Sequence, residues 1–282
     1  MLYNYRKLLV TFFILILITS CNGGEMTEKP TEFSSIKDIP TSSWERLAQK
    51  KIYFGHQSVG NNIIEGIQDL MKEHPEIKLN IVKTIDPVDF KGGIFAHSSI
   101  GKNDAPKSKI DAFADYMKKG IGNKSDIAFF KFCFADIIGT TDVNDVFRSY
   151  RNTMSELKEL YPKTTFVHVT VPLVTTNKSI KAWIKRMLGR KDIWFYDGNI
   201  KRNELNRLIL DEYSGREPVF DLAEVESTYP NGRREIFKEG SNVYYAMVPE
   251  FTKDAGHLNE EGRGRAAEQL LILLASLSKQ GK

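Results

Sequence analysis

The sequence has few cysteines and little excess charge of either sign, and these two shortages exclude several classes of protein. Only Cys21 and Cys133 occur in 282 residues, so at most one disulfide can form and no zinc-ligand spacing is present. The 40 basic and 36 acidic residues give a net charge of +4, which is too small to indicate a partner bound through nucleic-acid phosphates. With 41% hydrophobic residues, the chain is typical of one large globular domain or two small ones.

The sequence also lacks an apolar run long enough to span a bilayer. The longest run, from Leu8 to Ile18, is broken by Thr11 and follows Arg6 and Lys7. A short apolar run after basic residues predicts a secretory signal peptide over residues 1–20. Its removal would lower the net charge from +4 to +2, because Arg6 and Lys7 are its only charged residues.

The residues that follow the apolar run, Ile18-Thr19-Ser20-Cys21, resemble the bacterial lipobox. In that motif the cysteine is diacylated and becomes the new N-terminus. The resemblance implies a palmitate-bearing lipoprotein of the cell envelope, in the outer membrane or at the cell surface. The alternative is a plain secretory signal that happens to contain a cysteine. Residues 21–43 are polar and rich in glycine, proline, serine and threonine, which predicts a flexible tether before a domain over residues 44–282.

Five β-rich runs alternate with amphipathic helical segments in the predicted domain, and this alternation predicts an α/β three-layer sandwich with a five-stranded parallel sheet. The predicted strands are Lys51–Phe54, Leu79–Ile85, Ile127–Phe134, Thr165–Val171 and Val219–Leu222. The predicted helices are Asn61–Lys72, Lys107–Lys119, Val143–Leu160, Lys201–Tyr213 and Glu260–Leu277. Ligands of such sheets bind at the carboxyl ends of the strands.

Two motifs, one near each end of the predicted domain, contain side chains suited to catalysis. Ser58 lies on the turn between the first strand and its helix, where free backbone N–H groups can stabilise an oxyanion. On this turn alone, Ser58 is more simply explained as a helix N-cap. Asp254 precedes His257 by three residues just before the last helix, a spacing that lets the carboxylate orient the imidazole.

The order of these motifs resembles that of the SGNH (GDSL-like) hydrolases, over about residues 51–277, with their flavodoxin-like sheet. The resemblance implies an esterase-type hydrolase in which Ser58 is the nucleophile, His257 the general base and Asp254 its orienting partner. His56-Gln57-Ser58-Val59 stands where the family has Gly-Asp-Ser-Leu, so the first two positions differ.

The oxyanion hole follows from the same resemblance. The N–H groups of Ser58 and of a glycine after the second strand would hold the oxyanion, and Gly101 is our choice over Gly92 and Gly93. The family's third block is Gly-x-Asn-Asp, but this chain has Ala135 in place of the asparagine. Asn103 is our candidate for the missing donor, with Asn61 as the alternative.

Other residues leave several interpretations open. His56 and His97 fall at predicted strand ends and could contact substrate, or with His257 form a metal site; we expect no metal and no cofactor. Cys133 lies in an apolar strand and is expected to be a buried, unreactive thiol. The segment Pro172–Asn199 contains a basic amphipathic stretch with Trp183 and could be a lid, a membrane contact, a carbohydrate platform or an extra packed helix.

These observations favour a lipid-anchored serine hydrolase that cleaves small acyl esters, with acetyl groups on cell-surface or dietary glycans as plausible substrates. The expected partners are a small-molecule or glycan ester and the membrane, and no nucleic acid. The alternative is a non-catalytic glycan-binding or envelope-assembly module that kept the same fold.

Overall fold

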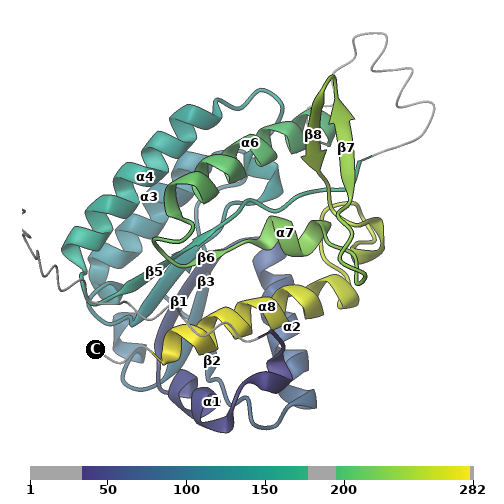
Figure 1. Cartoon of the computed structure of the whole chain (residues 1–282). Helices are drawn as coiled ribbons and strands as arrows, with labels where there is room; N and C mark the ends of the chain where they lie inside the picture. Colours follow the sequence, from purple (N-terminus) through teal and green to yellow (C-terminus); the bar gives the residue numbers. More distant parts are fainter. Residues whose placement is uncertain (1–33, 177–194, 280–282) are drawn as a thin grey trace, which may run out of the picture. The chain divides into compact units, whose positions relative to one another are not determined.

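A parallel sheet forms the centre of the domain (Figure 1). The computed structural model describes residues 34–176 and 195–279, which fall within one compact unit, residues 32–282. The strand order is β2-β3-β1-β4-β5-β6, and every neighbouring pair is parallel. The strands are β1 (Lys51–His56), β2 (Ile81–Lys83), β3 (Ile94–Ser99), β4 (Ile127–Phe130), β5 (Thr165–Val169) and β6 (Val219–Phe220).

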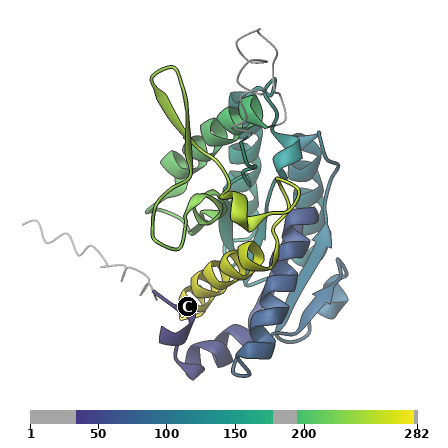
Figure 2. The same ribbon diagram turned by 90° about the vertical axis from the view of Figure 1, so that its right-hand side faces the viewer.

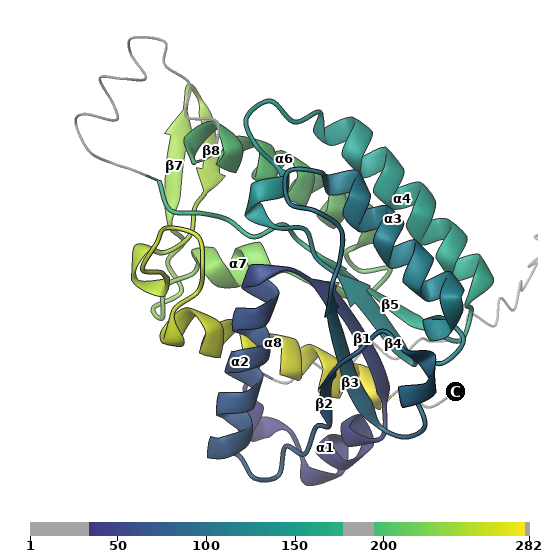
Figure 3. The same ribbon diagram turned by 180° about the vertical axis from the view of Figure 1, so that it is seen from behind.

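Helices cover both faces of this sheet. Those described are α1 (Thr41–Ala48), α2 (Ser58–Glu73), α3 (Pro106–Tyr116), α4 (Val143–Leu160), α6 (Tyr196–Tyr213), α7 (Leu222–Ser227) and α8 (Glu260–Ser278). Helices α1, α2 and α8 lie on one face and α3, α4 and α6 on the other, as Figure 3 shows from behind. A separate antiparallel hairpin, β7 (Ile236–Glu239) and β8 (Asn242–Tyr245), stands beside α6.

Alternating side chains of each strand build two cores, one on each face of the sheet. In β1, Ile52 and Phe54 pack toward α2 and α8, whereas Tyr53 packs toward α3. All three are almost completely buried, as expected for a parallel strand covered by helices on both sides. Helices α2 and α8 pack side by side over the first core (Figure 2).

The predicted three-layer α/β fold is confirmed, but the sheet has six strands rather than five. Without its edge strand β2, the order β3-β1-β4-β5-β6 is the flavodoxin-like order. The predicted strand Leu79–Ile85 contains only the edge strand, and the strand beside β1 is β3, which was not among the predicted strands. The sequence of β3 does not look like a buried strand because it contains polar residues. Two of them are buried: His97 is hydrogen-bonded to His56, and Ser98 to Tyr53.

The folded domain begins before the predicted boundary at residue 44. Ile36 and Ile39 are buried in the core beneath α8, and the backbone N–H of Ile36 donates to Glu268. Helix α1 then begins at Thr41. Residues 36–43 are therefore part of the domain and not of a tether, whereas residues 1–33, including Cys21, lie outside the described residues. None of the described helices is long and apolar enough to span a membrane.

Candidate active site

Ser58 is the first residue of α2, directly after the carboxyl end of β1. Gln57, not Ser58, is the N-cap residue, with extended backbone angles and no capping bond from its side chain. The N-cap interpretation of Ser58 is therefore wrong, and its half-buried hydroxyl is not used to cap the helix. Among the described residues, the backbone N–H groups of Ser58 and Val59 have no acceptor, as expected for the first turn of a helix.

Gln57 joins the Ser58 turn to the predicted oxyanion glycine. Its side-chain amide donates to the carbonyl oxygens of Ile100 at 2.8 Å and Gly101 at 3.1 Å, across more than forty residues of sequence. Gly101 has a φ of 54°, and a Cβ there would lie 2.7 Å from the backbone of Lys109, so only glycine fits. The structure thus brings Ser58 and Gly101 to one place. This role of Gln57 was not predicted, because from the sequence the residue is only a departure from Gly-Asp-Ser-Leu.

Asp254 and His257 form the predicted pair on the loop before α8. The Asp254 carboxylate contacts Nδ1 of His257 at 2.6 Å and also accepts the backbone N–H groups of Gly256 and His257. Partial burial alone would raise the pKa of Asp254, but these hydrogen bonds outweigh it and lower the pKa to about 2. Because an ionised carboxylate can only accept, Nδ1 carries a proton, and in the neutral imidazole the lone pair is therefore on Nε2.

Phe134, from the loop after β4, supports the histidine. Its ring meets the His257 imidazole edge to face at a centroid distance of 5.4 Å. A Cβ on Gly256 would lie 2.8 Å from the same ring, so the loop approaches Phe134 closely enough to require glycine. The loop after β4 therefore supplies an aromatic support for the histidine.

Ser58 and His257 lie on segments that contact each other, but the two side chains are not hydrogen-bonded to one another in the described part of the chain. The contact is made by Asn62, one turn after Ser58, whose Oδ1 accepts the N–H of Leu258 at 3.2 Å. His257 is 41% exposed and Asp254 57% exposed, so solvent reaches the pair. Catalytic hydrogen bonds are commonly loose without substrate, so the geometry leaves the triad as a prediction.

Asn103 is exposed on the loop after β3 and is held by a buried ion pair. Lys109 donates to its Oδ1 at 3.0 Å and to Asp136 at 2.6 Å, and neither charged side chain of the ion pair has any exposed surface. Because the lysine can only donate, the Asn103 oxygen must face it, which turns the amide NH₂ the other way. Asp136 in turn accepts the backbone N–H of Cys133, which is buried as predicted.

His56 and His97 form a hydrogen-bonded pair beside the Ser58 turn. His56 Nδ1 lies 2.9 Å from the Gln57 carbonyl, and its Nε2 lies 2.9 Å from His97 Nδ1. The carbonyl can only accept, so His56 Nδ1 carries a proton, and in the neutral His56 ring Nε2 then accepts from Nδ1 of His97. Burial, reinforced by nearby Lys131, lowers the pKa of His56 to about 3, and burial also lowers the pKa of His97. The pair is therefore neutral. Among the described residues, no cluster of three metal-ligating groups exists.

A second feature that was not predicted is a set of buried ionisable side chains beneath the strand ends. Lys131, directly after β4, has no exposed surface and donates to the carbonyl of Phe132. Glu226 of α7 accepts the N–H of Leu173, and burial raises its pKa to about 8. Arg202 of α6 donates to the carbonyl of Phe134. These residues fix the backbone of the loops on which the candidate site stands.

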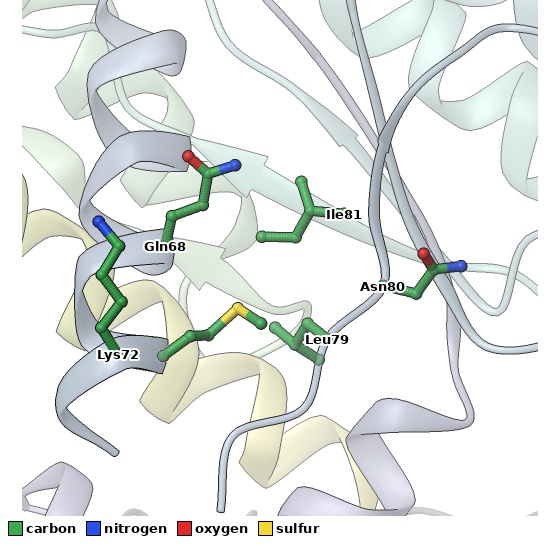
Figure 4. Close-up of a pocket in the computed structure, with 6 residues that line it drawn as sticks. Gln68, Lys72, Leu79, Asn80 and Ile81 are labelled. Atoms are coloured by element: carbon green, nitrogen blue, oxygen red, sulfur yellow. The ribbon is translucent and has the colours of Figure 1, made fainter. Parts of the chain in front are cut away.

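A surface cavity of about 520 Å³ lies elsewhere, along the second half of α2 and the approach to β2 (Figure 4). Gln68, which lines it, is ten residues after Ser58 and hence about 15 Å further along the helix. The other lining residues are Met71, Lys72, Leu79, Asn80 and Ile81. No candidate catalytic residue lines this cavity, so it is separate from the Ser58 site.

Fold and site together define a three-layer α/β protein with a serine and a hydrogen-bonded Asp–His pair at the carboxyl edge of its sheet. No family model matches the sequence, and no curated protein matches it either.

Solved structures to which the chain is similar include members of the family that the sequence resembles. A GDSL-like lipase from Bacteroides thetaiotaomicron is 15% identical, with a TM-score of 0.45 over 83% of this chain and 90% of that chain. An acetyl xylan esterase is 15% identical, with a TM-score of 0.43 over 78% and 98%. The periplasmic domain of a lipopolysaccharide acetyltransferase from Salmonella ser. Paratyphi A is 12% identical, with a TM-score of 0.43 over 82% and 85%. At such low identities the similarity concerns the fold alone, and the function must be argued from the residues of the site.

Proposed function

We propose that this protein is a serine hydrolase that cleaves acyl esters, with Ser58, His257 and Asp254 as its triad. The observation that carries the proposal is the Asp254–His257 pair. Its hydrogen bond leaves the Nε2 lone pair of His257 free, and that is the nitrogen a general base needs. The ionised Asp254 stabilises the imidazolium that forms when His257 accepts the serine proton.

The reaction follows from these groups. Ser58 Oγ attacks the ester carbonyl carbon while its proton passes to His257 Nε2, giving a tetrahedral oxyanion. The oxyanion accepts hydrogen bonds from the N–H groups of Ser58 and Gly101, neither of which has a partner among the described residues. His257 then protonates the leaving alcohol as the C–O bond breaks. The acyl group is then bonded to Ser58 Oγ. Water attacks the acyl carbon as His257 takes its proton, and His257 returns that proton to Ser58 Oγ as the Oγ–acyl bond breaks and the acid is released.

Asn103 is the proposed third donor of the oxyanion hole. The contact with Lys109 supports this assignment, because it fixes the amide with its NH₂ group directed away from the lysine. Acetyl groups on glycans are the proposed acyl substrates, since a partly exposed triad suits an ester on a large polymer. The competing function is a non-catalytic glycan-binding module, which the replacement of the family's asparagine by Ala135 favours.

A fluorophosphonate probe separates these two functions. The folded native protein is expected to be labelled on Ser58, located by peptide mass spectrometry, and Ser58→Ala is expected to lose both labelling and ester hydrolysis. Ser155→Ala, at an exposed position of α4, is the matched control. Asn103→Ala should lower kcat by about 10²–10³-fold with little change in KM. Lys102→Ala, at the exposed neighbouring position, should leave kcat unchanged. Absence of any label on Ser58 would favour the binding module.

A further inference from the structure

One side chain links the helix of the proposed nucleophile to the loop of the proposed base. Asn62 lies four residues after Ser58 on α2, so the two side chains share a face of the helix. Its Oδ1 accepts the backbone N–H of Leu258, the residue after His257, at 3.2 Å. The two partners are 196 residues apart in sequence. Since a backbone N–H can only donate, the amide oxygen must face the loop.

The loop that carries His257 holds a strained conformation. Ala255 has a φ of 76°, a left-handed backbone angle that costs a non-glycine residue energy. Such a conformation persists only where the surroundings enforce it. Among the described residues, two hydrogen bonds join the backbone of this loop to other segments: the N–H of Thr175 donates to the carbonyl of Ala255 at 2.9 Å, and Asn62 accepts from Leu258. Of these two, the Asn62 hydrogen bond leads to the helix of Ser58.

We infer that Asn62 is a positioning residue that sets the distance and orientation of His257 relative to Ser58. This inference rests on the proposed function. The Asp254 hydrogen bond orients the His257 ring within its own loop, but it does not relate that loop to α2. Asn62 supplies that relation directly, and His257 Nε2 must reach Ser58 Oγ for proton transfer. A misplacement of about 1 Å can cost about 10²-fold in rate.

The test compares three variants of the full chain in ester hydrolysis and in the rate of fluorophosphonate labelling. Asn62→Leu keeps the size of the side chain but removes the acceptor, and should lower kcat and the labelling rate by up to about 10²-fold with little change in KM. Asn62→Asp keeps an acceptor oxygen and should recover most of the activity. Gln68→Leu makes the same amide-to-leucine change on the same helix, away from the site, and should behave as the native protein.

An NMR measurement separates this inference from the proposed function. The ¹⁵N resonances of the His257 ring should shift in Asn62→Leu and not in Gln68→Leu, whether or not the protein hydrolyses esters. Native-like kcat together with unshifted His257 resonances in Asn62→Leu would overturn the inference. If the native protein neither hydrolyses esters nor labels at Ser58, the proposed function fails, and the resonances alone then decide whether Asn62 positions His257.

Discussion

At the scale of single residues, hydrogen-bond partners that can only accept fix which ring nitrogen of the site histidines carries a proton. Asp254 and the Gln57 carbonyl are such acceptors, and they place protons on Nδ1 of His257 and His56. The environments of the two rings then differ. His257 is open to solvent and paired with a carboxylate, whereas His56 is buried and paired with a second imidazole. One histidine is therefore suited to accept a proton in the reaction and the other to remain neutral.

The buried His56 should make the domain sensitive to mild acid. Its pKa of about 3 in the folded protein lies below the 6.5 of an unfolded histidine, so between these values the unfolded chain binds more protons. Stability must then rise with pH across this window and fall as the pH drops below about 6.5. One such proton corresponds to about 1.4 kcal/mol per pH unit.

Urea unfolding between pH 7.5 and pH 5 measures this dependence. His56→Gln should unfold with a shallower dependence of its free energy of unfolding on pH than the native protein. Other groups contribute to the native slope, since burial also lowers the pKa of His168 to about 4, so the difference between the two proteins is the informative quantity. Equal slopes would contradict the neutral state assigned to His56.

At the scale of elements, the first turn of α2 packs closely against the end of β1 at Gly60. Gly60 faces the His56 ring, and a Cβ on Gly60 would lie 2.3 Å from His56 carbon atoms. Gly60→Ala should therefore destabilise the domain by about 1–3 kcal/mol through overpacking, and should displace the turn that carries Ser58. Thermal or urea unfolding measures the loss.

Gly264 in α8 provides the control for this substitution. A Cβ there would meet no atom within 4 Å, so Gly264→Ala should raise stability by roughly 0.5–1 kcal/mol through helix propensity. If Gly60→Ala were as stable as the native protein, the close packing of Gly60 against His56 would be refuted.

The elements also show what the sequence could predict. Helix α4 begins and ends where its apolar spacing predicted, at Val143 and Leu160, because Asp142 caps it and its apolar face packs on the sheet. The Asp254–His257 pair was predictable because the two residues are only three positions apart in the sequence. Strand β3 and Gln57 were not, because their polar groups find partners on segments distant in sequence.

At the scale of the whole domain, the candidate site and helix α1 lie at opposite ends of the sheet. Helix α8 begins at Glu260, three residues after His257, and near its other end Ser278 donates to the carbonyl of Ser43 in α1. Its 19 residues span about 28 Å. The order of elements along the sheet agrees with this separation. Helix α1 precedes the amino end of β1, and Ser58 follows the carboxyl end of the same strand.

This separation leads to a prediction about membrane attachment, which we propose to occur through a lipid on Cys21. Cys21 precedes the first described residue, Ser34, by thirteen residues, and helix α1, which follows, lies at the end of the sheet away from the candidate site. Cys21→Ala should therefore move the protein from the membrane to the soluble fraction, or leave the precursor unprocessed, while the kcat of the released domain on a small soluble ester stays unchanged.

Membrane partition and intact mass measure the first effect. An unchanged mass and partition would show that Cys21 carries no lipid, and a lost activity in the released, folded domain would show that catalysis depends on the membrane.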